Sequence, residues 1–175
     1  MKHYTFAAQL HALWDKACRL YAQGQRGAET YFTADEAAFL AANGITTQHL
    51  YDYGEDFTAG GEPPWETALA IELVRRDYFL NAQGGKPSAV VLDETKMPAK
   101  TDAIRGIEWL PRIIPKAEAK LRGELPPTLM YCCGGDRRFF QAHDIHPAEF
   151  LSLVWRHERN DAAIVDWVAR RSAAK

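Results

Sequence analysis

The side chains best suited to chemistry gather in one stretch of the chain. Tyr131-Cys132-Cys133-Gly134-Gly135-Asp136 opens this stretch, and His143, Asp144, His146 and Glu149 follow within it. Thiolate, imidazole and carboxylate groups are zinc ligands, and four of them could close a tetrahedral site. The spacing disfavours such a site, because the cysteines are adjacent and neither Cys-x-x-Cys nor His-Glu-x-x-His occurs. We therefore predict no metal site and no bound cofactor.

A cysteine nucleophile is a second hypothesis for the same stretch. Cys133 precedes two glycines and a predicted helix start, so amide groups and the helix dipole could stabilise its thiolate. The alternative is that this cysteine is a small buried apolar side chain. The sequence contains no catalytic motif, and it leaves open whether the protein is an enzyme.

An anion site is a third hypothesis. The backbone amides of Gly134 and Gly135 could converge on an anion with the guanidinium groups of Arg137 and Arg138. The Gly-Lys-Ser/Thr ending of a Walker loop is missing. The structural alternative is a glycine turn, an Asp136 helix cap and a solvated charged face.

Basic residues also follow one stripe of the preceding predicted helix. Arg112, Lys116 and Lys120 are spaced four residues apart, which places them on one face of a helix. Such a stripe is usually in water, and it matters only if it points at the Tyr131–Arg138 turn. Our candidate ligand-binding residues are those that this turn and this stripe could bring together: Arg112, Lys116, Tyr131, Asp136 and Arg138.

The elements that must position these residues follow an internal repeat. When residues 10–50 are laid over residues 110–150 without a gap, seven pairs are identical: Leu10/Leu110, Lys16/Lys116, Ala17/Ala117, Tyr31/Tyr131, Phe39/Phe139, Ala42/Ala142 and Ile45/Ile145. The matches fall on apolar helix positions, on the Tyr before a turn and on the end of the next helix. Such repetition predicts two similar modules, in which Phe39, Phe139, Ile45, Ile145 and Trp167 are expected to be buried.

Periodicity and capping signals predict helices in the first half. Residues 4–22 have apolar residues at three- and four-residue spacing. Thr33 and Glu36 have the spacing of a capping box for a helix ending near Ala42. Thr46 is expected to cap a third helix, and a fourth is expected from Trp65 to about Asn81.

The sequence of the second half predicts helices in the same order. A helix carries Leu110 to Leu121, where Pro115 should kink or restart it. Asp136 and His146 are expected to begin the next two helices, and Asn160 is expected to cap the last. The predicted fold is all-α, with about eight helices in two tandem modules at residues 1–81 and 103–175. Residues 82–102 are expected to form a linker with at most one short strand.

The second module resembles a bacterial family known as domain of unknown function 5069. The resembling positions, in order, are Leu110-Pro111-Arg112, Lys116, Leu121, Gly123, Tyr131, Gly135-Asp136, Phe139-Phe140, Ile145, Phe150 and Trp167-Val168. The resemblance implies a soluble, largely helical bacterial protein. It carries no activity, cofactor or catalytic residue to transfer, and Cys132 and Cys133 depart from the pattern.

Composition narrows the classes of function. The chain has 175 residues, 47% of them hydrophobic, and a formal net charge of −2. This charge gives no basic field for nucleic acid or an anionic membrane, and no apolar run is long enough to span a bilayer. Three cysteines, two of them adjacent, argue against a disulfide framework and favour the cytoplasm.

The predicted function is a non-enzymatic binding or interaction module with a protein partner or a second copy. The alternative is a small-molecule- or anion-binding protein, or an enzyme, with a polar pocket near Tyr131–Arg138.

Overall fold

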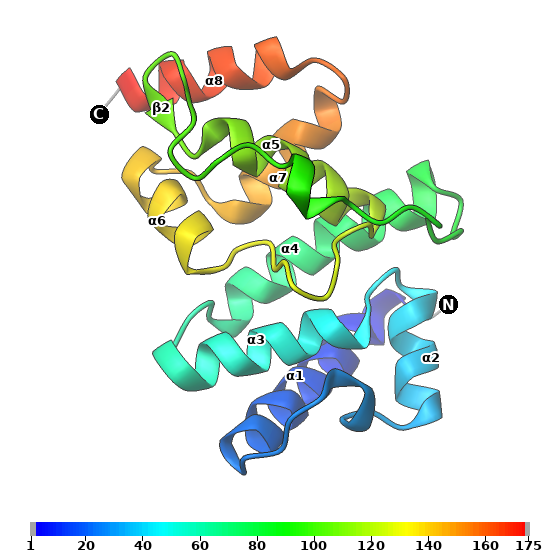
Figure 1. Ribbon diagram of the computed structural model, residues 1–175. Helices are drawn as coiled ribbons and strands as arrows, with labels where there is room; N and C mark the ends of the chain where they lie inside the picture. The colour runs from blue at the N-terminus through cyan, green and yellow to red at the C-terminus, as the bar shows by residue number, and fades with distance from the viewer. Residues whose placement is uncertain (1–2, 174–175) are drawn as a thin grey trace. The chain divides into compact units, whose positions relative to one another are not determined.

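The computed structural model describes residues 3–173, and they form two compact units (Figure 1). One unit ends at Lys86 and the other begins at Pro87. The elements of the first unit, in order, are η1 (His3–Thr5), α1 (Phe6–Ala22), η2 (Ala28–Thr30), α2 (Ala34–Ala42), α3 (Thr47–Gly60), α4 (Trp65–Asp77) and a π-helical turn, η3 (Tyr78–Ala82).

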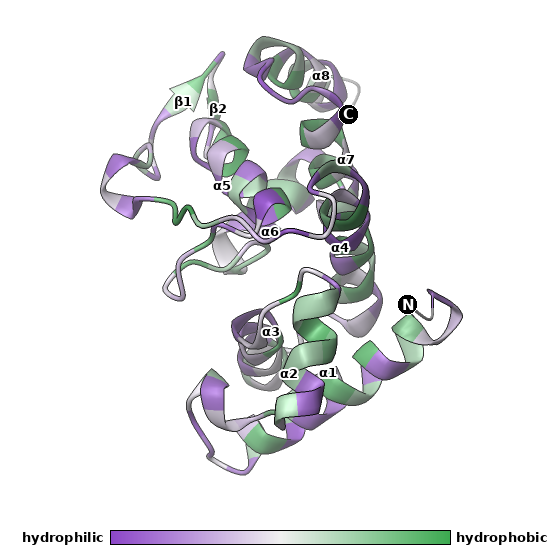
Figure 2. Ribbon diagram, turned by 90° about the vertical axis from the view of Figure 1, so that its right-hand side faces the viewer, coloured by the Kyte–Doolittle hydropathy of each residue, from purple (hydrophilic) through white to green (hydrophobic). Residues whose placement is uncertain are grey.

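The first unit is built on the contact between α1 and α3. Apolar and hydrophilic residues alternate along α1, as expected of an amphipathic helix (Figure 2). Its apolar face buries Leu10, Leu13 and Ala17. Gly54 of α3 lies so close to Ala17 that a Cβ at residue 54 would be 2.9 Å from the Ala17 carbonyl carbon. The missing side chain therefore permits the close approach of the two helices.

The second unit contains a small hairpin and four α-helices. Its elements are η4 (Glu94–Lys96), β1 (Ala103–Ile104), β2 (Ile107–Glu108), α5 (Leu110–Arg122), α6 (Gly134–His143), α7 (Pro147–Arg156) and α8 (Asp161–Ala173). Helix α5 packs on α7, and α6 contacts α8. The core lies between these helices and includes Ile113, Phe140, Phe150, Val154 and Ile164.

The hairpin is held at its turn and at its end. Arg105 and Gly106 both have positive φ, as a two-residue type I′ turn requires. The Arg105 guanidinium pairs with Asp166 of α8 at 2.5 Å. Where the hairpin runs into α5, the Trp109 amide donates to the Asp102 carbonyl. The turn is thus fixed to α8, and the bond between Trp109 and Asp102 extends the pairing of the two strands as far as the start of α5.

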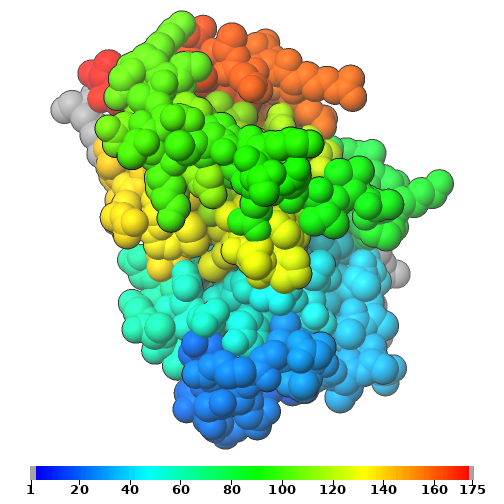
Figure 3. Space-filling view, in the orientation of Figure 1, coloured from blue at the N-terminus to red at the C-terminus, as the bar shows by residue number. Residues whose placement is uncertain are grey.

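An extended segment precedes the hairpin and lies on the surface of the second unit (green in Figure 3). Val90 and Val91 are 60% and 65% exposed. The Leu92 amide donates to the Glu124 carbonyl, which attaches the segment to the loop after α5. Residues 87–102, which we expected to be linker, therefore lie within the second compact unit.

The all-α prediction is confirmed, with eight α-helices among the described residues and only one two-stranded sheet. The Thr33–Glu36 capping box, the Thr46 cap and the Asn160 cap are all present. His146 begins α7 with a capping box of its own.

Several local predictions are wrong. Cys133, not Asp136, is the N-cap of α6, because the helix already begins at Gly134. Helix α5 continues through Pro115, so a restart there is wrong, whereas a kink stays a prediction; the proline removes only the bond to the Pro111 carbonyl. Phe39 and Trp167 are half-buried rather than buried, whereas Phe139, Ile45 and Ile145 are in the core. The prediction of at most one short strand in residues 82–102 is not among these errors, because the hairpin strands begin directly after this segment, at Ala103.

Candidate ligand-binding site

A buried carboxylate organises the start of α6. Asp136 is fully buried, and its Oδ2 accepts from the Lys116 ammonium at 2.7 Å and from the Cys132 amide at 2.9 Å. Its Oδ1 accepts from the indole Nε1–H of Trp109 at 3.0 Å. Three donors thus satisfy one buried charge, as burial of a carboxylate requires.

Two of these donors belong to residues in a sparsely populated backbone conformation. Trp109 has φ of 69° and Cys132 has φ of 72°, values that L-residues with large side chains rarely adopt. Each is bonded to the Asp136 carboxylate, Trp109 through its side chain and Cys132 through its amide. The carboxylate therefore holds in place two strained positions, which are common where a site is shaped for a ligand.

Lys116 is buried to 2% exposure and connects α5 to the start of α6. Besides Asp136, its ammonium contacts the Sγ of Cys133 at 3.2 Å. The neighbouring Cys132 is fully buried, and this burial, with the nearby Asp136 charge, raises the pKa of its thiol to about 12. Cys132 is therefore protonated at neutral pH and behaves as a small core residue, whereas Cys133 is half-buried.

The absence of a side chain at Gly135 makes room for the Trp109 ring. A Cβ at residue 135 would lie 2.4 Å from Cζ2 of Trp109, so only glycine lets the indole rest on the first turn of α6. The indole is then fixed by its Nε1–H bond to Asp136 and by the close approach of the neighbouring Cζ2 to Gly135. Its position is set before any ligand arrives.

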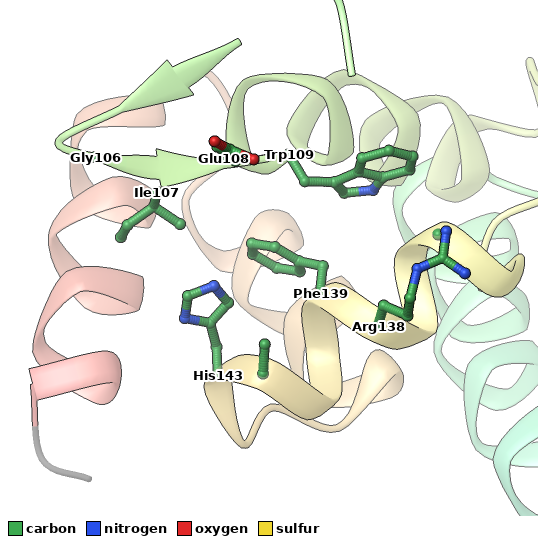
Figure 4. Close-up of a pocket in the computed structure, with 9 residues that line it drawn as sticks. Gly106, Ile107, Glu108, Trp109, Arg138, Phe139 and His143 are labelled. Carbon is green, nitrogen blue, oxygen red and sulfur yellow. The ribbon is translucent and has the colours of Figure 1, made fainter. Parts of the chain in front are cut away.

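The indole forms one wall of a cavity of about 390 Å³ (Figure 4). The hairpin, the start of α5 and one face of α6 supply the lining, which comprises Gly106, Ile107, Glu108, Trp109, Gly135, Arg138, Phe139, Ala142 and His143. In Figure 4, Ile107 extends from the hairpin toward Phe139 and His143, while Trp109 and Arg138 lie at the other side. The lining combines the apolar side chains of Ile107, Trp109 and Phe139 with the polar side chains of Glu108, Arg138 and His143.

The polar side chains of the lining differ in exposure and in their hydrogen-bond partners. Arg138 is exposed and forms no ion pair among the described residues. His143 lies 2.7 Å through Nδ1 from the Ser172 hydroxyl, which itself donates to the Val168 carbonyl. His143 is thus linked through Ser172 to the backbone of α8. The lining therefore includes one exposed cation, Arg138, and one carboxylate, Glu108.

The predicted ligand-binding residues take three different positions. Lys116 and Asp136 do come together, but as a buried pair behind the cavity. Tyr131 is buried and donates its hydroxyl to the Pro147 carbonyl, and burial raises its pKa well above the usual value. The Arg112 guanidinium donates to the Pro98 carbonyl. Only Arg138 lines the cavity, and ligand binding by all five stays a prediction.

Sequence reasoning missed Trp109, Phe139 and His143 as lining residues. Gly135, Arg138, Phe139 and Ala142 have the spacing of one helical face, so this signal was available. Trp109 and the hairpin gave no such signal, because neither a positive φ at a tryptophan nor a two-residue strand can be read from periodicity. Within residues 3–173 no group of three or more His, Cys, Asp or Glu side chains is arranged to hold a metal ion.

These features define a mostly helical protein whose second unit presents a preformed cavity backed by a buried ion pair. Residues 95–175 match the model of a family described as Domain of unknown function (DUF5069). The match over these residues confirms the resemblance predicted for the second module. No curated protein and no solved structure matches the chain. No described helix has the length and apolar character needed to cross a bilayer.

Proposed function

We propose that the second unit is a binding module, without catalytic activity, for a small organic anion with a flat apolar body. The ligand body would lie against Trp109 and Phe139, and its anionic group would pair with Arg138. The single observation that carries this proposal is the cavity itself, which joins a fixed indole wall to a guanidinium that has no other ion pair.

The size and lining of the cavity support this choice. Small-molecule sites are typically about 300–1,000 Å³ and mostly apolar, with a few placed polar groups. A planar guanidinium recognises carboxylate and phosphate oxygens through paired N–H donors. Because the indole is already held in place, less conformational entropy is lost when a ligand binds.

The test is an NMR titration of the full chain with benzoate, followed through the Trp109 indole Nε1–H signal. Arg138→Gln should weaken benzoate binding while leaving the fold intact, because Arg138 is exposed. Arg156→Gln is the matched control, since it removes an exposed arginine from the same unit outside the cavity. Equal weakening by both variants would point to general electrostatics, and no movement of the Trp109 signal with any aromatic carboxylate would refute the site.

We further propose that the two units are copies of one ancestral module. Helices α2 and α6 begin 100 residues apart, and so do α3 and α7. The Lys16–Glu36 ion pair, at 2.6 Å, recurs 100 residues later as Lys116–Asp136, at 2.7 Å. A superposition that places Tyr31 on Tyr131 and Phe39 on Phe139 supports common origin, whereas pairing in different helices argues against it.

We also propose that the protein works in the cytoplasm. Its three cysteines are all free thiols, including the adjacent pair, and free thiols persist in a reducing compartment. Fractionation of cells that produce the full-length protein tests this placement.

A further inference from the structure

A second cavity lies in the first unit, between α1 and the start of α2. Its volume is about 270 Å³, and its lining comprises Gln9, Ala12, Leu13, Asp35, Glu36 and Phe39. Leu13 is buried and Phe39 is half-buried, so the cavity has an apolar floor and an aromatic wall. The two carboxylates are its charged groups, and no cationic side chain lines it.

The two carboxylates are not equivalent. Glu36 is paired with Lys16 at 2.6 Å and also accepts from the Thr33 amide. Burial raises the pKa of Glu36, but these hydrogen bonds outweigh it and hold the pKa below its usual range. Asp35 is exposed and has no hydrogen bond or ion pair within residues 3–173. The cavity rim therefore carries one negative charge that no side chain offsets.

The charged residues of this cavity differ from those of the cavity in the second unit. Positions 9, 35 and 39 line the first cavity, and positions 109, 135 and 139 line the second. Three pairs of positions 100 residues apart thus line the two cavities, although Gln9 lies within α1 and Trp109 precedes α5. Asp35 stands where the other unit has Gly135, and Ala38 stands where it has Arg138. The first cavity therefore has two carboxylates and no cation, whereas the second has the Glu108 carboxylate and the Arg138 cation.

From this geometry we propose a second ligand site in the first unit, selective for a small organic cation with an apolar body. The ammonium group would pair with Asp35 and lie near the Phe39 ring, whose negative face attracts cations. The apolar body would rest on Leu13 and Ala12. The proposal uses only residues of the first unit and does not depend on the anion site proposed for the second.

The experiment compares three probes of similar shape, benzylammonium, benzyl alcohol and benzoate, by NMR titration of the labelled full chain. Benzylammonium should shift the Gln9 side-chain amide and the backbone amides of Asp35 and Glu36 at the lowest concentration, and benzoate at the highest. Asp35→Asn should weaken benzylammonium binding by up to about fivefold, the range expected for a partly exposed charge pair. It should leave benzyl alcohol binding unchanged.

Glu66→Gln is the matched control, because Glu66 is also an exposed carboxylate in the first turn of a helix in this unit. It does not line the cavity and should not change benzylammonium binding. Phe39→Leu, which keeps an apolar side chain, should weaken benzylammonium more than benzyl alcohol. The proposal is overturned if the three probes bind alike, if Asp35→Asn and Glu66→Gln have the same effect, or if the shifts fall outside the cavity.

Discussion

At the scale of single residues, the buried Asp136 carboxylate determines the shape of the candidate site. It joins α5 through Lys116 and fixes both Trp109 and the backbone of Cys132. Sequence reasoning selected Asp136 and Lys116 but expected them to contact a ligand. Their burial could not be predicted, because a charged stripe with i, i+4 spacing looks the same whether its partner is water or a buried carboxylate.

Asp136→Asn should destabilise the second unit strongly. The substitution removes the negative charge and leaves the Lys116 ammonium buried without its partner, which costs about 3–5 kcal/mol. The measurement is urea unfolding followed by the amide signals of α5 and α6. A loss of under about 1 kcal/mol, the size of a surface pair, would mean that water reaches Lys116.

Glu36→Gln breaks the corresponding pair of the first unit and serves as the comparison. Lys16 and Glu36 keep 23% and 29% of their side-chain surface exposed, so the pair should contribute only about 0–1 kcal/mol. The pKa of Glu36 is lowered from its ordinary value of 4.5. Its contribution is therefore present above pH 4.5 and lost as the pH falls through the lower, folded pKa. Unfolding curves of wild type and Glu36→Gln should converge in acid, and a difference that persists at pH 2 would contradict this.

The three thiols should react at different rates. Burial, with the Asp15 charge adding to it, raises the pKa of Cys18 to about 11, and Cys132 is at about 12. Since the thiolate is the nucleophile, iodoacetamide at pH 8 should leave both largely unmodified, and Cys133 should be alkylated first. Asp15→Asn should speed alkylation of Cys18, because it removes a charge that raises this pKa. Peptide mass mapping gives the rates, and early modification of Cys132 would show that its burial is transient.

At the scale of elements, helix starts were the most predictable feature and the hairpin the least. Thr33, Thr46, His146 and Asn160 were recognised because capping uses side chains at fixed spacing from the first turn. The positions of Trp109 and Gly135 depend on a contact between a loop residue and a helix 26 residues later. No local pattern encodes such a contact, so the wall of the cavity was missed.

Alanine substitutions at the adjacent Gly134 and Gly135 test the contact between Trp109 and α6. Gly135→Ala places a methyl group 2.4 Å from the indole and should cost about 1–3 kcal/mol by overpacking. Gly134→Ala meets nothing closer than 3.7 Å and should be neutral or stabilising by about 0.5–1 kcal/mol, because alanine favours the helix. Thermal unfolding of the two variants measures the difference. Equal melting temperatures would place the indole elsewhere.

At the scale of the whole molecule, the starts of α2 and α6, and those of α3 and α7, are 100 residues apart. Side chains at this spacing still differ in burial, since Phe139 is 5% exposed and Phe39 is half-buried. The matching positions specify a helix face, whereas the depth of burial depends on what packs over it. In the second unit the hairpin adds Ile107 beside Phe139, and the first unit has no such hairpin among its described residues.

The segment between the two units should be the first site of proteolytic cleavage. Residues 84–91 contain two glycines and the exposed Val90 and Val91, and no helix or strand includes them. Exposed chain without secondary structure is where proteases cut first. Trypsin is poorly suited, because Pro87 follows Lys86, but elastase accepts small apolar residues such as Ala89 and Val90. Brief elastase treatment should therefore give two fragments of nearly equal length, each retaining its helical circular dichroism after separation. If the first cut falls inside one of the eight helices, or if a purified fragment unfolds, the units are not independent folding domains.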